Sequence, residues 1–390
     1  MIKRILPLFV LLIGLSAFAF IFGQDAHPPK LQRRKPPEDE QNQQKSDQKK
    51  DQKPQSKEDQ DAITLGTDLV TFNLNITDAR GHRLTNLKQS DVEVFEDDTK
   101  QQISFFNTSE EPFHVVLLID VSGSTQQQIG QIQRAAKMFL NELKPDDQVA
   151  IVSFAESPTL ECDFTHDRAK LERSISRLTV PPPKQGGTSF YDSMRIMVEQ
   201  VMNSVEGRKA FVALTDGVDS TSTGSFDDAL DYATRGDGAG YFIQVDTEEY
   251  ALGMVMKNEV EDGAARITPQ QLRRYVSVVD VGDPSRYTDS NKLSPLERRE
   301  VNTKLYEIAR DELAEMAEKS GGRVYPISGL ENAPDAFKQI AEEIRLQYSV
   351  GYYPKPEKHD GQWHKIRVEV KVPGAKVHTR PGYTAPKESK

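Results

Sequence analysis

Cysteine is nearly absent from this chain of 390 residues, which contains only Cys162. A single cysteine excludes an internal disulfide framework and a cysteine-rich zinc site. We predict that Cys162 is a small buried side chain and not a reactive thiol. Tryptophan is equally scarce. We interpret the single Trp363 as a packing anchor of a β domain, and the alternative is an exposed contact residue.

An excess of basic residues is also missing. The chain has 50 lysines and arginines against 60 aspartates and glutamates, a formal net charge of -10. Proteins that bind nucleic acids usually carry a basic stripe, so this balance argues against a nucleic-acid partner. The length suits about two domains, at ~100–200 residues each.

A long apolar run occurs only at the N-terminus. Residues 1–23 begin with the basic segment MIKR and continue with an uncharged stretch from Ile5 to Gly23. A basic start and an apolar core are typical of an export signal, and this core is also long enough to span a bilayer. We therefore expect an exported protein, periplasmic, on the cell surface or secreted. Residues 1–23 would be its signal peptide or its anchor in the inner membrane.

Residues 24–62 lack apolar side chains almost completely, with Leu31 as the only large one. They contain nine lysines and arginines, nine aspartates and glutamates, and nine glutamines. Such a segment buries too little apolar surface to offset its ordering entropy. We predict a disordered, charged linker that separates the folded part from a membrane or wall.

Two flanking regions show the alternation of apolar and polar residues that is typical of half-buried strands. In residues 63–110 it is clearest from Val70 to Ile76, and in residues 348–384 it runs from Ile366 to Val372. Neither region is long enough to bury much core by itself. We expect both to join one accessory antiparallel β domain, with a hairpin turn at Asp360-Gly361.

In the middle of the chain, residues 112–346, short runs of apolar residues alternate with segments whose apolar residues recur at the helical period. This pattern predicts an α/β fold, a doubly wound and mostly parallel sheet with helices on both faces. Residues 247–303 are charged and weakly patterned, and we interpret them as a largely helical insertion. The apolar runs, each expected to be a buried strand, cover residues 115–119, 148–154, 210–217, 240–246 and 323–328.

Carboxylates and hydroxyls gather where the predicted strands end. Asp120 ends the first core strand and Asp216 ends the third. Hydroxyls follow at Ser122 and Ser124, and Thr188 comes after a Gly-Gly loop that precedes a helix. Ligands of open α/β sheets sit at the carboxyl ends of the strands, so we expect these five side chains to meet at one edge.

Three enzymatic interpretations of this edge lack a necessary residue. A covalent aspartyl phosphatase needs a second acid two residues after its nucleophile, where this chain has Ser122. An aspartic protease needs Asp-Thr/Ser-Gly, and here Val121 intervenes. A serine hydrolase needs a base near its nucleophile, and the sequence places no histidine at this edge. His166 is the one histidine whose position the sequence leaves undecided.

A metal site fits the same residues better. Neutral hydroxyls with few carboxylates make an all-oxygen site for a hard cation, and Mg2+ (or Mn2+) keeps several waters in such a sparse shell. An open coordination position can take a carboxylate from a partner protein. We therefore predict a binding protein and not an enzyme. The alternative is a metal-dependent hydrolase that uses the same edge.

Three segments together resemble the metal-ion-dependent adhesion site of von Willebrand factor A domains. They are Asp120-Val121-Ser122-Gly123-Ser124, Gly186-Gly187-Thr188 and Leu214-Thr215-Asp216-Gly217. The flanks are similar to bacterial proteins with such domains, common in Acidobacteria. The resemblance implies that Ser122, Ser124 and Thr188 coordinate Mg2+ or Mn2+, that Asp120 and Asp216 bind it directly or through water, and that the protein has an adhesion or scaffold role.

Overall fold

The computed structural model describes residues 29–34, 69–80, 83–108, 112–182, 187–236, 238–257 and 267–387. The side chain of Ser124, the predicted export signal and most of the predicted linker lie outside this description. Within these ranges, no helix is both long and apolar enough to cross a membrane.

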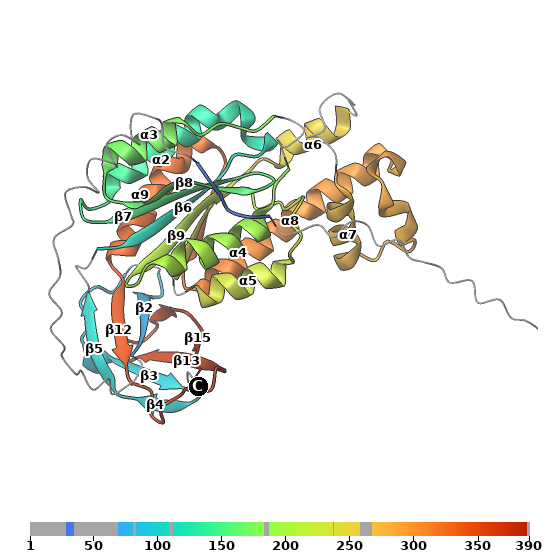
Figure 1. The fold of residues 1–390 in the computed structure, drawn as a ribbon. Coiled ribbons are helices and arrows are strands. Elements are labelled where there is room, and N and C mark those ends of the chain that lie inside the picture. The colour runs from blue at the N-terminus through green and yellow to red at the C-terminus, as the bar shows by residue number, and fades with distance from the viewer. Residues whose placement is uncertain are drawn as a thin grey trace, which may run out of the picture.

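A seven-stranded sheet forms the centre of the α/β domain, which comprises residues 112–347 together with β1 (Figure 1). The strand order is β1-β8-β7-β6-β9-β10-β11, and all neighbours are parallel except the antiparallel pair β7 and β8. The predicted doubly wound, mostly parallel sheet is therefore confirmed. The strands are β1 (Gln32–Arg33), β6 (His114–Asp120), β7 (Gln148–Phe154), β8 (Pro158–Thr165), β9 (Lys209–Thr215), β10 (Gly238–Val245) and β11 (Arg323–Ile327).

Helices cover both faces of this sheet (Figure 1). One apolar core includes Phe139, Leu171 and Phe337 from the first group of helices. The other includes Met194 and Leu313 from the second group. The first group is α2 (Ile129–Glu142), α3 (Arg168–Ser176) and α9 (Ala333–Arg345), and the second is α4 (Phe190–Gln200), α5 (Phe226–Arg235) and α8 (Pro295–Ser320). Because both faces of the central strands are covered, their side chains are apolar on both sides, and the strands appear in the sequence as continuous apolar runs.

The edge of the sheet beyond β7 differs from the prediction. β8 carries charged residues and was not among the predicted core strands, and β1 lies in the segment predicted as a disordered linker. That prediction is wrong at residues 29–34, because β1 pairs in parallel with β8 and Leu31 packs against the sheet. Arg34 explains the docking, since its Nε lies 2.9 Å from Oε2 of the buried Glu161.

Two four-stranded antiparallel sheets form the accessory β domain, residues 69–108 and 348–387, around one apolar core. Their orders are β14-β2-β12-β5 and β15-β13-β3-β4, so each sheet combines strands from both flanks, as predicted. The strands are β2 (Val70–Thr77), β3 (Val92–Glu96), β4 (Thr99–Gln101), β5 (Ile103–Thr108), β12 (Tyr348–Tyr352), β13 (Trp363–Val370), β14 (Lys376–His378) and β15 (Gly382–Thr384).

One detail of the accessory β domain contradicts a prediction, and one detail of the α/β domain confirms another. β12 and β13 belong to different sheets, so Asp360-Gly361 is not a hairpin turn between paired strands. Trp363 is 39% exposed at the start of β13, and its ring lies so close to Gly382 of β15 that a Cβ there would be 2.7 Å from it. The ring therefore packs on β15 while part of it stays exposed. Cys162 is a free, buried cysteine in the core of the α/β domain, as predicted.

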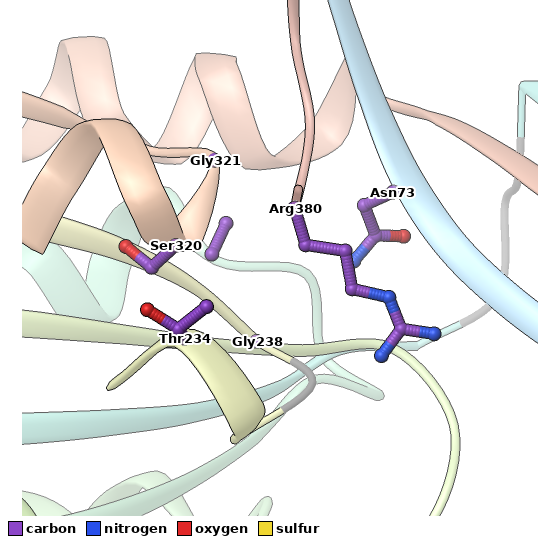
Figure 2. A pocket seen from close by; sticks show the side chains of 7 residues that line it. Asn73, Thr234, Gly238, Ser320, Gly321 and Arg380 are labelled. Atoms are coloured by element: carbon purple, nitrogen blue, oxygen red, sulfur yellow. The ribbon is translucent and has the colours of Figure 1, made fainter. Parts of the chain in front are cut away.

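Polar contacts join the two domains. Glu343 of α9 is 2% exposed, and its carboxylate accepts hydrogen bonds from Asn75 of β2 and from Tyr325. The Arg83 Nη2 atom lies 2.9 Å from Oε2 of the same carboxylate. Beside this contact, Arg380 and Asn73 face the end of α8 across a small pocket (Figure 2).

Candidate metal centre

The carboxyl ends of β6 and β9 bring two predicted site residues to the same edge of the sheet. The strands are parallel neighbours with Ile119 opposite Leu214, so Asp120 and Asp216 end or follow adjacent strands. The Thr215 hydroxyl donates to Oδ2 of Asp120 at 2.8 Å and links the two strand ends directly.

Asp120 sits in an environment that opposes its negative charge. It is 1% exposed, and the Ser122 backbone N–H donates to its Oδ1 at 2.9 Å. Burial, followed by the repulsion from Asp216, raises the pKa of Asp120 to about 7, although hydrogen bonds from Ser122 and Thr215 lower it.

Ser122 precedes a short 3-10 helix, Gly123–Gln128, that leads into α2. A serine at this position often caps a helix through its side chain. Here the Ser122 side chain makes no capping hydrogen bond, although it is only 1% exposed. Its hydroxyl is turned toward Asp120, to which it contributes a hydrogen bond.

Thr188 lies in a short loop that is held between two others at this edge. Its carbonyl accepts from the N–H groups of Ser220 and Thr221 at 2.8 and 3.1 Å, and the next residue donates to the carbonyl of Ala155. Gly187 permits this approach, because a Cβ there would lie 2.5 Å from a side-chain carbon of Thr221. Thr188 is 8% exposed.

Asp216 is held by two residues that the sequence analysis did not identify. The Thr247 hydroxyl donates to Oδ2 of Asp216 at 2.6 Å, and the Tyr306 hydroxyl lies 3.5 Å from the same oxygen. The Val218 N–H donates to Oδ1 at 3.0 Å. Thr247 begins the insertion and Tyr306 follows it, and no local pattern marks either residue as a partner of a distant strand end.

The insertion borders this edge of the sheet. It contains α6 (Glu248–Lys257), α7 (Pro269–Val278) and the first turns of α8, with its own small apolar core. The Thr268 hydroxyl donates to the carbonyl of Ser220 at 2.9 Å, and Gln270 donates to Asp219 at 3.2 Å. The loop that follows Asp216 is therefore held by the insertion.

A pocket of about 240 Å³ opens beside Asp216. It is lined by Tyr306 and Arg310 of α8 and by the ends of β10 and β11. Arg310 is paired with Glu248 at 3.1 Å. The candidate site is thus next to a concave surface with a cation at its rim.

The described residues fit a divalent cation. Asp120 and Asp216 are both buried, and Asp216 raises the cost of ionising Asp120. A cation between them would offset this cost, and their oxygen donors with the hydroxyls of Ser122 and Thr188 match the preference of Mg2+ for oxygen.

The histidines of the α/β domain lie away from this edge. His114 begins β6, at the opposite end of that strand from Asp120. His166 follows β8, and Thr165 pairs with Val149 near the start of β7, so His166 also lies at the opposite edge. Neither can act as a base at Asp120.

Residues 115–218 match the family model of the von Willebrand factor type A domain. No curated protein matches the sequence. Among solved structures, an aerotolerance-related membrane protein from Bacteroides fragilis is 13% identical, with a TM-score of 0.37, over 60% of this chain and 98% of that one. BatB from Bacteroides thetaiotaomicron is 15% identical, with a TM-score of 0.37, over 60% and 97%. A von Willebrand factor type A protein from Catenulispora acidiphila is 13% identical, with a TM-score of 0.40, over 83% and 76%.

Proposed function

We propose that this chain, which contains a von Willebrand factor type A domain at residues 115–218, binds a protein partner through a Mg2+- or Mn2+-dependent site. The protein would be exported or tethered to a membrane, with an adhesion or scaffold role. The observation that carries the proposal is the pair of buried carboxylates, Asp120 and Asp216, at the ends of adjacent parallel strands.

The chain's own residues would hold and orient the ion. Ser122, Ser124 and Thr188 would offer hydroxyl oxygens, and Asp120 and Asp216 would offer charge. Thr247 would fix the orientation of Asp216 through its 2.6 Å hydrogen bond. When bound, the ion supplies an electrophilic centre for a carboxylate of the partner.

The pocket beside Asp216 suggests where the rest of the partner would lie. A residue next to the partner's carboxylate could enter this pocket of about 240 Å³, close to Tyr306 and Arg310. Concave surfaces with a few polar groups are preferred binding positions. A hydrolase at the same edge would need a general base, and His114 and His166 lie at the other edge.

Thr188 offers a matched pair of variants as a test. Thr188→Val removes the hydroxyl at nearly constant volume, while Thr188→Ser keeps it. We expect Mg2+ and Mn2+ affinity, measured by calorimetric titration of the full chain, to fall by at least about tenfold in Thr188→Val and to stay near the parent value in Thr188→Ser. Equal affinity of both variants and the parent would contradict the proposed role of Thr188.

The partner is tested separately. A pull-down with the full chain as bait should capture a protein in Mg2+ that is released by a chelator and is not captured by Asp120→Asn. If the amount of captured protein changes neither with the chelator nor with the substitution, the interface does not depend on a metal.

A further inference from the structure

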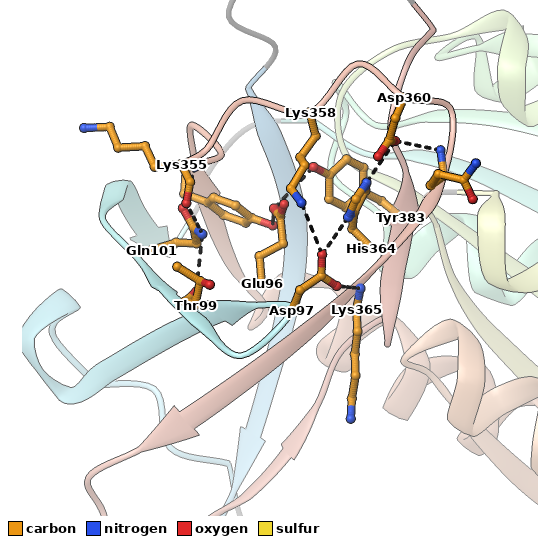
Figure 3. Close-up of polar contacts among 12 residues, drawn as sticks. Glu96, Asp97, Thr99, Gln101, Lys355, Lys358, Asp360, His364, Lys365 and Tyr383 are labelled. Atoms are coloured by element: carbon orange, nitrogen blue, oxygen red, sulfur yellow. Dashed lines mark hydrogen bonds and ion pairs between the residues drawn. The ribbon is translucent and has the colours of Figure 1, made fainter.

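A second cluster of metal-ligand side chains lies in the accessory β domain, remote in sequence from the first. One carboxylate oxygen of Glu96, one of Asp97 and one ring nitrogen of His364 lie within 4.8 Å of one another (Figure 3). Glu96 ends β3 and Asp97 begins the turn that follows. His364 belongs to β13, which pairs with β3. The sheet itself therefore brings these residues together.

Glu96 has an oxygen without a partner. The residue is 2% exposed, and its Oε2 accepts hydrogen bonds from the hydroxyls of Tyr352 at 2.6 Å and Tyr383 at 3.2 Å. Its Oε1 is buried and has no hydrogen-bond partner. An orphaned buried carboxylate oxygen is costly and unusual in native proteins, so it calls for a ligand.

Asp97 and His364 are each held by one contact through an atom that a metal would not need, and their other atoms contact each other. Oδ1 of Asp97 accepts from the Lys365 N–H at 3.1 Å. His364 lies between two carboxylates, with Nε2 at 3.1 Å from Asp360 and Nδ1 at 2.7 Å from Oδ2 of Asp97 (Figure 3). A carboxylate on the far ring nitrogen is the usual support of a metal-bound histidine.

The charges around the cluster leave room for a cation. Three carboxylates, those of Glu96, Asp97 and Asp360, surround His364, and the Lys358 ammonium lies 3.6 Å from Asp97. Both ring nitrogens face a carboxylate, so without metal an imidazolium and Lys358 together face three carboxylates, which leaves one negative charge. A divalent ion that replaces one imidazolium proton would balance the charge, in competition with Lys358 for Asp97.

We propose that Glu96, Asp97 and His364 form a second metal site, which binds a divalent transition-metal ion and suits Zn2+ best. Imidazole with two carboxylates is a donor set that Zn2+ accepts at three protein positions with one open, whereas Mg2+ and Ca2+ prefer oxygen throughout. Bound Zn2+ would replace the hydrogen that now links His364 Nδ1 to Asp97 Oδ2 at 2.7 Å. The two atoms would have to move apart to admit the ion, because each must lie about 2 Å from it in tetrahedral geometry. The bound ion fastens the turn after β3 to β13 and does not depend on the function of the α/β domain.

Zinc binding to the full chain tests this site, with bound metal measured by equilibrium dialysis of ZnCl2 in excess Mg2+ to compete at Asp120 and Asp216. We expect zinc binding in the parent, and a loss of at least about tenfold in affinity in Glu96→Gln and His364→Gln. Asp360→Asn, an exposed change that leaves all three ligands in place, should weaken binding by about tenfold. His359→Gln is the matched control and should bind as the parent does.

Two results would overturn the proposal. One is a parent protein that takes up no zinc at micromolar concentrations. The other is equal zinc binding in the parent, Glu96→Gln, His364→Gln and Asp360→Asn. Thermal unfolding without metal shows whether each variant is folded, and Asp360→Asn decides the question if a substitution of a ligand is not tolerated.

Discussion

Asp120 determines how the candidate metal centre responds to pH. Its pKa is raised to about 7 in the folded chain, against an ordinary value of 3.8, because it is buried beside Asp216. The folded state thus holds a proton more tightly than the unfolded state. Proton binding by Asp120 therefore stabilises the folded chain. This stabilisation is complete below about pH 4 and is lost as the pH rises through about 7.

We predict opposite pH trends with and without metal. Without divalent ions, ionisation of Asp120 should lower the free energy of unfolding by up to about 4 kcal/mol between pH 4 and pH 8. Added Mg2+ should raise the melting temperature strongly above pH 7 and little below pH 6, because protons compete for the same oxygens. Melting curves of the parent and Asp120→Asn measure this. An Mg2+ effect that is equal at pH 5 and pH 8 would contradict it.

The side chains at strand ends were the part of the candidate site whose position the sequence could predict. Asp120 and Asp216 follow continuous apolar runs, and Thr188 follows a Gly-Gly loop, so each is marked by its neighbours in sequence. Thr247 and Tyr306 lacked such a mark, because their contact with Asp216 depends on how the insertion folds back. The Glu96, Asp97 and His364 cluster was missed for the same reason, since 267 positions separate Asp97 from His364.

At the scale of elements, burial on both faces made four strands of the central sheet easy to predict from the sequence. β6, β7, β9 and β10 are covered on both sides and appear as unbroken apolar runs. β8 and β1 form the edge, where charged side chains replace apolar ones. β1 was missed because its residues are held by pairing and by ion pairs, which the composition of a segment does not show.

The docking of β1 gives a matched pair of arginine variants. Arg34 is paired with Glu161, whose side chain is 2% exposed, whereas Arg33 is paired with Asp163, which is 57% exposed. We predict that Arg34→Ala destabilises docking by about 1–2 kcal/mol and Arg33→Ala by less than about 0.5 kcal/mol. Hydrogen exchange of the Arg34 amide, which is bonded to Leu160, reports docking. Similar exchange in both variants would refute the role of Glu161.

At the scale of the whole molecule, the buried Glu343 couples the two domains. Glu343→Ala leaves Arg83 and Asn75 without their partner, and we predict a loss of about 2–3 kcal/mol in the free energy of unfolding. The neighbouring Glu342→Ala is the control, because Arg83 uses only its backbone carbonyl. Trp363 fluorescence follows the accessory β domain, and far-ultraviolet dichroism follows the helices of the α/β domain. The two transitions should separate in Glu343→Ala alone, and coincident transitions would show that other contacts couple the domains.

The interleaving of the two flanks has a consequence for the order in which this protein folds during synthesis. β2 lies between β14 and β12, and β5 pairs with β12. Both strands come from the N-terminal flank, and all of their partners in the sheet come from the C-terminal flank. Chains emerge N-terminus first, and β2 and β5 must therefore wait, with open edges, until the last residues arrive. Folding of the α/β domain brings Thr108 and Tyr348 to the same position and shortens the loop that must close. The α/β domain in the middle of the chain would thus fold first, and the accessory β domain would be completed afterwards, once both flanks are held close together.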